Sequence, residues 1–172
     1  MTIFSTSDSD LATEILALGR ELTLASIRPD GTPHASTVSY ANIGLVVYFA
    51  VAIDSQKTQN IEHNRQVAFA VNTPYKKWKE IRGMAVDAAA RLVTGTDELA
   101  LAEGLLLIKY PEFAAVISNP LQLPWPGMLI IRCDPSFISL LDYTKGFGHT
   151  TRFRIGSNPN ISPLRNVALE NR

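Results

Sequence analysis

The chain has 172 residues, of which 46% are hydrophobic and 19% are charged, and its sixteen basic residues balance sixteen acidic ones. This length is enough for one domain with its own core, and the charge balance argues against a general nucleic-acid-binding protein, which carries a basic surplus. The single cysteine, Cys133, excludes an internal disulfide and a cysteine-rich structural metal site.

The first ten residues, MTIFSTSDSD, are polar and acidic and lack the basic start and apolar core of a signal peptide. The most apolar runs, residues 45–53 and 105–108, are too short to cross a bilayer. We therefore expect a cytoplasmic protein with no membrane partner and no nucleic-acid partner.

The first predicted element is a helix over residues 9–20. Ser7 to Ser9 supply N-cap candidates, and Leu11, Ile15 and Leu18 then recur at helical spacing.

Most of the remaining chain reads as short strands joined by turns. Pro29-Asp30-Gly31 and Asn42 to Gly44 are turn signals, because Pro presets φ and Gly accepts a positive φ. Seven segments have strand-like composition: residues 22–28, 33–41, 45–51, 66–72, 79–94, 128–133 and 137–143. Within the longest of them, Gly83 indicates a bulge or a close approach of another backbone.

Three more helical segments are predicted between the strands. One begins at Ser55 and ends near His63. A longer one is capped by residues 96–98 and runs to about Lys109, with its acidic residues at the favourable end of the helix dipole. The last begins at Pro111, a good first helical residue.

Six or seven strands with short hairpins and few helices predict a closed or nearly closed antiparallel barrel. Closure would remove the exposed edges that such strands otherwise present. We assign residues 1–144 to this domain. Residues 145–172 are rich in Gly, Asn, Pro and Arg, and we expect a partly extended segment that contributes to the site or to a subunit interface.

The chain between residues 22 and 71 also predicts an anion-binding corner beside the strands. A helix that begins after Ser55 presents free backbone N–H groups and the positive end of its dipole. Lys57 adds a positive charge. The neighbouring strand carries small side chains that leave room for a flat ring: Ala35, Ser36, Thr37 and Ser39. This pattern indicates a site for a flat, phosphorylated cofactor.

Four pieces carry a family resemblance: RPDGTPHASTVSY (28–40), LVVYFAV (45–51), DSQKTQNIEHNRQVAF (54–69) and IRGMAVDAAARLV (81–93). In order and spacing the chain resembles the flavin-reductase-like split barrels of the pyridoxamine 5′-phosphate oxidase superfamily, over residues 10–143. The resemblance implies a six- to seven-stranded antiparallel split β-barrel with flanking helices. It also implies a homodimer with two cofactor sites at the subunit interface.

The same resemblance implies twelve cofactor-binding residues. Those beside the FMN ring would be Ser36, Thr37, Val38 and Ser39. Those at the ribityl phosphate would be Ala50, Val51, Ser55 and Lys57. Those that approach from the partner subunit would be Trp78, Arg82 and Gly83, and His149 would shape the substrate mouth.

The chain departs from pyridoxamine-phosphate oxidases proper at three places. Those enzymes usually have Arg where Ser36 stands, a second basic residue where Gln56 stands, and a C-terminal Arg-x-His where this chain has residues 152–154, Arg-Phe-Arg. The resemblance therefore implies the reductase branch, with hydride or electron transfer between FMN and a small planar substrate. Because the cofactor supplies the chemistry, no side chain is assigned as catalytic and no metal ligand is expected.

Three alternatives stay open. Deazaflavin F420 would suit the same fold, but its longer acidic tail would demand a basic groove. His149, between glycines in the segment KGFGH (145–149), could ligate haem in a haem-binding or haem-degrading split barrel. A non-catalytic barrel that binds a ligand without turnover would agree with the missing phosphate-side arginines.

Overall fold

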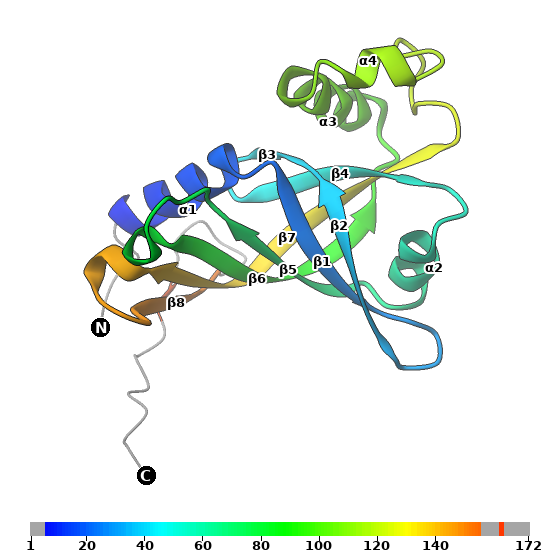
Figure 1. Ribbon diagram of the computed structural model, residues 1–172. Coiled ribbons are helices and arrows are strands. Elements are labelled where there is room, and N and C mark those ends of the chain that lie inside the picture. The colour runs from blue at the N-terminus through cyan, green and yellow to red at the C-terminus, as the bar shows by residue number, and fades with distance from the viewer. Residues whose placement is uncertain (1–5, 156–161, 164–172) are drawn as a thin grey trace.

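The computed structural model describes residues 6–155 and 162–163. The chain forms an antiparallel sheet that curls into a half-barrel, with helices packed around it (Figure 1). Its described strands are β1 (Glu21–Ile27), β2 (Pro33–Ser39), β3 (Ala41–Ile43), β4 (Val46–Ala52), β5 (Gln66–Asn72), β6 (Arg82–Leu92), β7 (Met128–Asp142), β8 (Thr150–Arg154) and β9 (Ser162–Pro163). Its described helices are α1 (Thr6–Leu18), α2 (Gln56–His63), α3 (Thr96–Lys109) and α4 (Phe113–Val116), with 3₁₀ turns η1 (Trp78–Glu80) and η2 (Tyr143–Lys145).

The order of the strands leaves the barrel open along one side. The sheet runs β2-β1-β5-β6-β7-β4-β3, and β8 adds to β7 and β9 to β8. Each neighbouring pair is antiparallel. The two strands at the opening, β2 and β4, come close to each other but do not pair. The expected split barrel is therefore confirmed.

The main core lies inside the curl of the sheet. Along β1, Leu22 and Leu24 are buried while Glu21, Thr23 and Ala25 are exposed, as the two-residue period of a strand dictates. Buried side chains of β5, β6 and β7 join the same cluster, and α1 covers it from one side. Burial of these apolar residues provides the main stabilisation of the half-barrel.

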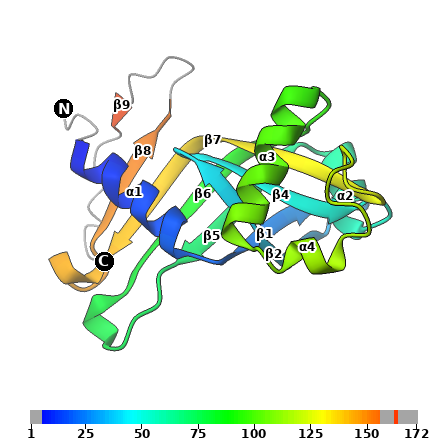
Figure 2. The same ribbon diagram turned by 90° about the horizontal axis from the view of Figure 1, so that it is seen from above.

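A second core lies outside the curl, between α3 and the strands β3, β4 and β7. Tyr48, Leu99, Leu106, Trp125 and Ile130 are buried there. Seen from above, α3 and α4 form a lobe across one end of the sheet (Figure 2). We call residues 96–127, from α3 to the start of β7, the helical lobe. Because the lobe packs beside the open side of the barrel, it supplies one wall of the candidate site.

Several predicted boundaries need correction. The single strand β7 replaces the two strands predicted over 128–133 and 137–143. All of β6 pairs with it, and a register shift between Asp87 and Ala88 lets the pairing continue. The strand predicted from residue 79 begins at Arg82, because the residues before it form η1.

The expected close approach at Gly83 is confirmed. A Cβ at this position would lie 2.9 Å from the backbone oxygen of Val71 and 2.4 Å from the Oδ1 of Asn72, both on the paired strand β5. From residue 145 onward, η2 and β8 replace part of the expected extension, and β8 belongs to the sheet. The rest of that segment, 156–161 and 164–172, lies outside the described residues.

Candidate functional site

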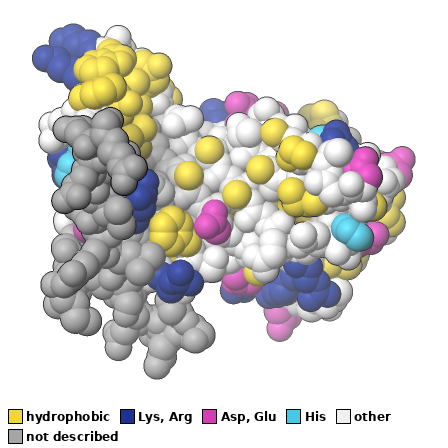
Figure 3. All heavy atoms as spheres, turned by 90° about the horizontal axis from the view of Figure 1, so that it is seen from below, with side chains coloured by type: hydrophobic (Ala, Val, Ile, Leu, Met, Phe, Trp, Pro, Cys, Tyr) yellow, Lys and Arg dark blue, Asp and Glu magenta, His cyan; other side chains and the backbone are white. Residues whose placement is uncertain are grey.

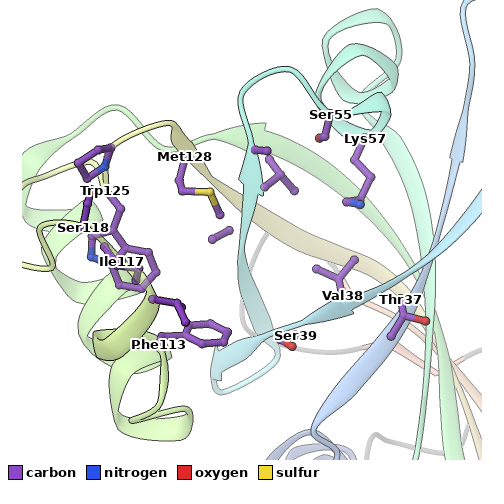
Figure 4. A pocket seen from close by; sticks show the side chains of 15 residues that line it. Thr37, Val38, Ser39, Ser55, Lys57, Phe113, Ile117, Ser118, Trp125 and Met128 are labelled. Carbon is purple, nitrogen blue, oxygen red and sulfur yellow. The ribbon is translucent and has the colours of Figure 1, made fainter.

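A cavity of about 490 Å³ lies at the open side of the barrel, between the strands and the helical lobe (Figure 4). This volume falls within the usual range for small-molecule sites. It is lined from β2, from β4 and the start of α2, from α4 and the segment after it, and from the start of β7. The lining residues are Thr37, Val38, Ser39, Ala50, Val51, Ala52, Ser55, Lys57, Phe113, Val116, Ile117, Ser118, Trp125, Pro126 and Met128.

One end of the cavity combines a lysine, a helix-capping serine and the N-terminus of α2. Ser55 caps α2, since its Oγ accepts the backbone N–H of Thr58 at 3.3 Å. The N–H groups of Gln56 and Lys57 have no hydrogen-bond partner in the part of the chain described here. Lys57 is the one charged residue among the fifteen described lining residues. A cation, a hydroxyl and free N–H groups at a helix N-terminus together suit a phosphate.

The middle of the cavity has a flat wall made by two strands. From β2 come Thr37, Val38 and Ser39, and from β4 come the small or β-branched residues Ala50 to Ala52. Because β2 pairs only with β1, the backbone groups along its other edge are free to bond a ligand. The wall therefore offers both room for a planar ring and polar partners for the ring's edge.

The opposite wall, from the helical lobe, is apolar and aromatic. In Figure 4, Phe113, Ile117 and Trp125 lie on one side of the cavity, and Ser55 and Lys57 on the other. The Trp125 side chain is only 1% exposed, and its ring packs edge-on against Phe113 with centroids 6.4 Å apart. The lobe thus presents a firm hydrophobic surface to the cavity.

A buried carboxyl group fixes this wall to α3. The Oε1 of Glu103 accepts the backbone N–H of Trp125 at 3.0 Å. Glu103 is only 2% exposed, and this burial raises the pKa of its carboxyl group. The Oε2 atom has no partner among the described residues. The group therefore acts from inside the lobe, as a support for the segment that carries Trp125.

The cavity unites seven of the residues predicted to bind the cofactor: Thr37, Val38, Ser39, Ala50, Val51, Ser55 and Lys57. Ser36 is not among the lining residues, and its Oγ is buried without a partner in the described chain. None of the twelve residues predicted to bind the cofactor lies in the helical lobe. The sequence feature that could have indicated this wall is the pair of aromatic residues, Phe113 and Trp125, that flank a proline-rich segment.

The other four predicted residues lie away from this cavity, next to η1 and η2. Trp78 stacks on Phe147 with ring centroids 5.2 Å apart. Arg82 pairs with Asp142 at 3.3 Å, and Gly83 follows it in β6. The Nε2 of His149 lies 3.5 Å from the hydroxyl of its neighbour Thr151. The expectation that Trp78, Arg82 and Gly83 reach the site of a partner subunit stays a prediction, as does the role of His149 at the substrate mouth.

The described residues hold no group of three or more His, Cys, Asp or Glu side chains that could hold a metal ion. Within the same part of the chain, every helix is too short or too polar to cross a membrane.

Comparisons with known proteins agree with this architecture. The family model described as pyridoxamine 5′-phosphate oxidase matches residues 11–113. No curated protein matches the chain significantly. Among solved structures, a heme binding protein from Mycobacterium smegmatis has a TM-score of 0.72 at 20% identity, and the match covers 85% of this chain and 57% of that protein. The chain therefore spans little more than half the length of that relative.

Two further solved structures are similar. The heme storage protein from Vibrio cholerae has a TM-score of 0.58 at 17% identity, with 78% of this chain and 91% of that protein covered. A structure described as an F420 reductase has a TM-score of 0.55 at 27% identity, with 73% of this chain and 94% of that protein covered.

Proposed function

The chain belongs to the pyridoxamine 5′-phosphate oxidase family, and from this we propose that it is an FMN-dependent oxidoreductase whose flavin lies in the cavity beside β2 and β4. The observation that carries the proposal is the division of the cavity. One end has Lys57 with two unpaired backbone N–H groups, and a flat wall of small strand residues leads away from it. FMN is divided in the same way, because it joins a charged phosphate to a flat ring.

The donor set at the α2 end fits a phosphate. Lys57 would form a charge-assisted bond to a phosphate oxygen, and the N–H groups of Gln56 and Lys57 would complete the cradle. The free edge of β2 would orient the polar side of the ring, and the apolar lobe would exclude water from it. When bound, FMN would supply the hydride or electron transfer that no side chain of the cavity provides.

F420 is a second candidate, favoured by the likeness to a described F420 reductase at 27% identity. Its longer acidic tail would need more positive charge than Lys57 alone brings to the cavity. Haem is the third candidate, since two similar structures are described as heme proteins. His149 is not among the residues that line the cavity, so haem ligation by it would require another site in the same protomer or the cavity of a partner subunit.

The test is an absorption and fluorescence titration of the purified protein with FMN, F420 and haemin in turn. We expect FMN to bind, and Lys57→Ala to weaken it about tenfold or more, the usual worth of a charge-assisted hydrogen bond. Arg65→Ala is the control, because this exposed cation follows α2 but lies outside the cavity. Absence of FMN uptake would refute the proposal, and uptake of F420 or a Soret band would replace it.

We also propose that the protein is a homodimer that pairs through the outer face of the sheet. The outward residues of the central strands are small, among them Thr23, Ala25, Ala70 and Ala85. Figure 3 shows this side as scattered small hydrophobic groups with few charged ones between them. Around these small residues the middle of the face has few long side chains, which suits the packing of one sheet on another. The contribution of Trp78, Arg82, Gly83 and His149 to a partner's cavity depends on this pairing.

The molar mass in solution, from light scattering after gel filtration, tests the dimer. We expect twice the chain mass, and a monomer for Ala85→Arg, which places a long cation on the face. Ile108→Arg is the matched control on the exposed side of α3. A monomeric wild-type protein, or a dimer unaffected by Ala85→Arg, would contradict the proposed interface.

A further inference from the structure

The flavin proposal gives the helical-lobe wall of the cavity no role beyond the exclusion of water. We infer that the helical-lobe side of the cavity binds the ring system of an uncharged, planar, apolar substrate. This inference rests on the proposed function, because it names the substrate class of the same site. It assigns the phosphate end to the cofactor and the lobe side to the molecule with which the cofactor reacts.

The first argument is charge. The lobe side of the cavity is lined by Phe113, Val116, Ile117, Trp125 and Met128, with Ser118 as its one hydroxyl. Lys57, the one cation among the described lining residues, lies on the opposite side (Figure 4). A carboxylate or phosphate against this wall would lose water without gaining a cationic partner, which is costly. The wall therefore selects against anionic substrates such as pyridoxamine phosphate.

The second argument is ring geometry. Phe113 stacks on Tyr110 with an interplanar angle of 15° and centroids 5.0 Å apart, and it meets Trp125 edge-on at 84°. The Tyr110 hydroxyl bonds the backbone carbonyls of Arg20 and Tyr40. Because these contacts fix the orientation of Phe113, the wall is organised before any ligand arrives. A preorganised aromatic surface favours a planar ring over a flexible chain.

The third argument is the exposed apolar rim. Val116 lines the cavity and yet is 80% exposed. Met128, which lines the same side of the cavity, has a flexible and polarizable thioether that adapts to aromatic ligands. A ligand that covers these side chains would remove apolar surface from water, which is favourable.

The test uses para-naphthoquinone as the probe, with its monosulfonate as a charged analogue of the same ring. The chain has two tryptophans, and the Trp78→Phe variant leaves Trp125, within the wall, as the single tryptophan reporter. We expect naphthoquinone to quench this fluorescence saturably. In the FMN-saturated protein, where the phosphate end is occupied, the sulfonate should bind about tenfold more weakly than naphthoquinone, since an unpaired charge there is disfavoured.

Two matched variants locate the binding. Ile117→Lys puts a cation into the wall and should weaken naphthoquinone about tenfold or more. Leu121→Lys makes the same change four residues later, at a side chain that is 92% exposed and outside the lining, and should leave the affinity unchanged. Equal effects of the two variants would overturn the inference, as would absence of saturable quenching.

The FMN titration separates this inference from the proposed function. Naphthoquinone should still bind when FMN is saturating, so displacement by FMN would assign the lobe wall to the flavin and overturn the inference. Naphthoquinone binding that depends on Ile117, in a protein that takes up no FMN, would refute the flavin proposal and uphold the wall as a ligand site. Similar affinity for naphthoquinone and its sulfonate would overturn the inference.

Discussion

Glu98 is the electrostatic link between the helical lobe and the sheet, and its loss should be measurable. Both carboxylate oxygens accept hydrogen bonds from Arg91, at 2.8 and 2.9 Å. Its Oε1 also accepts from Arg132 at 2.8 Å and from the Tyr48 hydroxyl at 3.1 Å. The Glu98 side chain is 23% exposed, between the buried and the fully solvated limits. We predict that Glu98→Gln destabilises the protein through this network.

The expected loss of stability depends on the ion pairs that Arg91 and Arg132 keep in the Glu98→Gln variant. Asp134 remains as a partner, at 2.6 Å from Arg132 but at 3.8 Å from Arg91. Exposed ion pairs contribute at most about 1 kcal/mol, whereas breaking a buried pair costs about 3–5 kcal/mol. A half-buried carboxylate with two arginine partners should lie between these limits, at about 2 kcal/mol. For a chain of this length, that loss lowers Tm by about 5 °C.

The assay is thermal unfolding by calorimetry, with Glu112→Gln as the matched control. Glu112 pairs with Arg20 at 3.0 Å, but both side chains are more than 60% exposed, so its loss should cost less than about 1 kcal/mol. If Glu98→Gln lowers Tm no more than Glu112→Gln does, the reasoning is wrong.

The pH dependence supplies a second check on the same group. Hydrogen bonds, first from Arg132 and also from Arg91 and Tyr48, hold the pKa of Glu98 below its ordinary 4.5. A carboxyl group whose pKa is lower in the folded state stabilises the protein fully above the ordinary pKa. This contribution is lost as pH falls through the folded-state pKa. The Tm difference between wild type and Glu98→Gln should therefore shrink in acid, and a constant difference would contradict the assignment.

Three further predictions address other elements. Burial lowers the pKa of Lys109 from 10.5 to about 8, so the unfolded state binds more protons between these values and the free energy of unfolding should rise with pH there. Urea denaturation should show this rise in wild type and not in Lys109→Met. In Gly83→Ala, the new Cβ would lie 2.4 and 2.9 Å from two oxygen atoms of β5, and the clash should cost about 2 kcal/mol. In the control variant Gly104→Ala, the new Cβ in α3 meets nothing within 4 Å, so the substitution should stabilise the protein by about 0.5–1 kcal/mol. Equal stabilities of the two variants in chemical denaturation would refute the packing argument. Ser55→Ala should cost about 1 kcal/mol by loss of the N-cap of α2, and an unchanged denaturation midpoint would show that the cap contributes nothing.

Local signals predicted the elements that local physics controls. The helix after Ser55 begins and ends where its capping residues place it, with Asn64 at its C-terminal end. The strand over 66–72 has the predicted bounds, and α3 ends at Lys109 as predicted. Its N-cap is Gly95, so residues 96–98, predicted to cap the helix, form its first turn instead. Caps, turns and periodicity act within a few residues, so they can be read from a single segment.

Two of the predictions that failed concern segments whose conformation depends on pairing with a distant strand. The two predicted strands of β7 merge because β6 supplies hydrogen-bond partners on both sides of Pro135. β8 forms in the segment expected to be an extension, because β7 offers it an edge. In both places, another strand distant in the sequence decides the conformation.

The sequence by itself determined the split-barrel class and the half of the cavity that β2, β4 and α2 form, since Thr37 to Lys57 are close in the chain and carry the family pattern. Only the tertiary structure brought Phe113, Trp125 and Met128 to the other side of that cavity. The physical reason is the strand order, which places β7 beside β4 although β5 and β6 come between them in sequence. That order is set by the cooperative burial of the whole sheet, and no short segment encodes it.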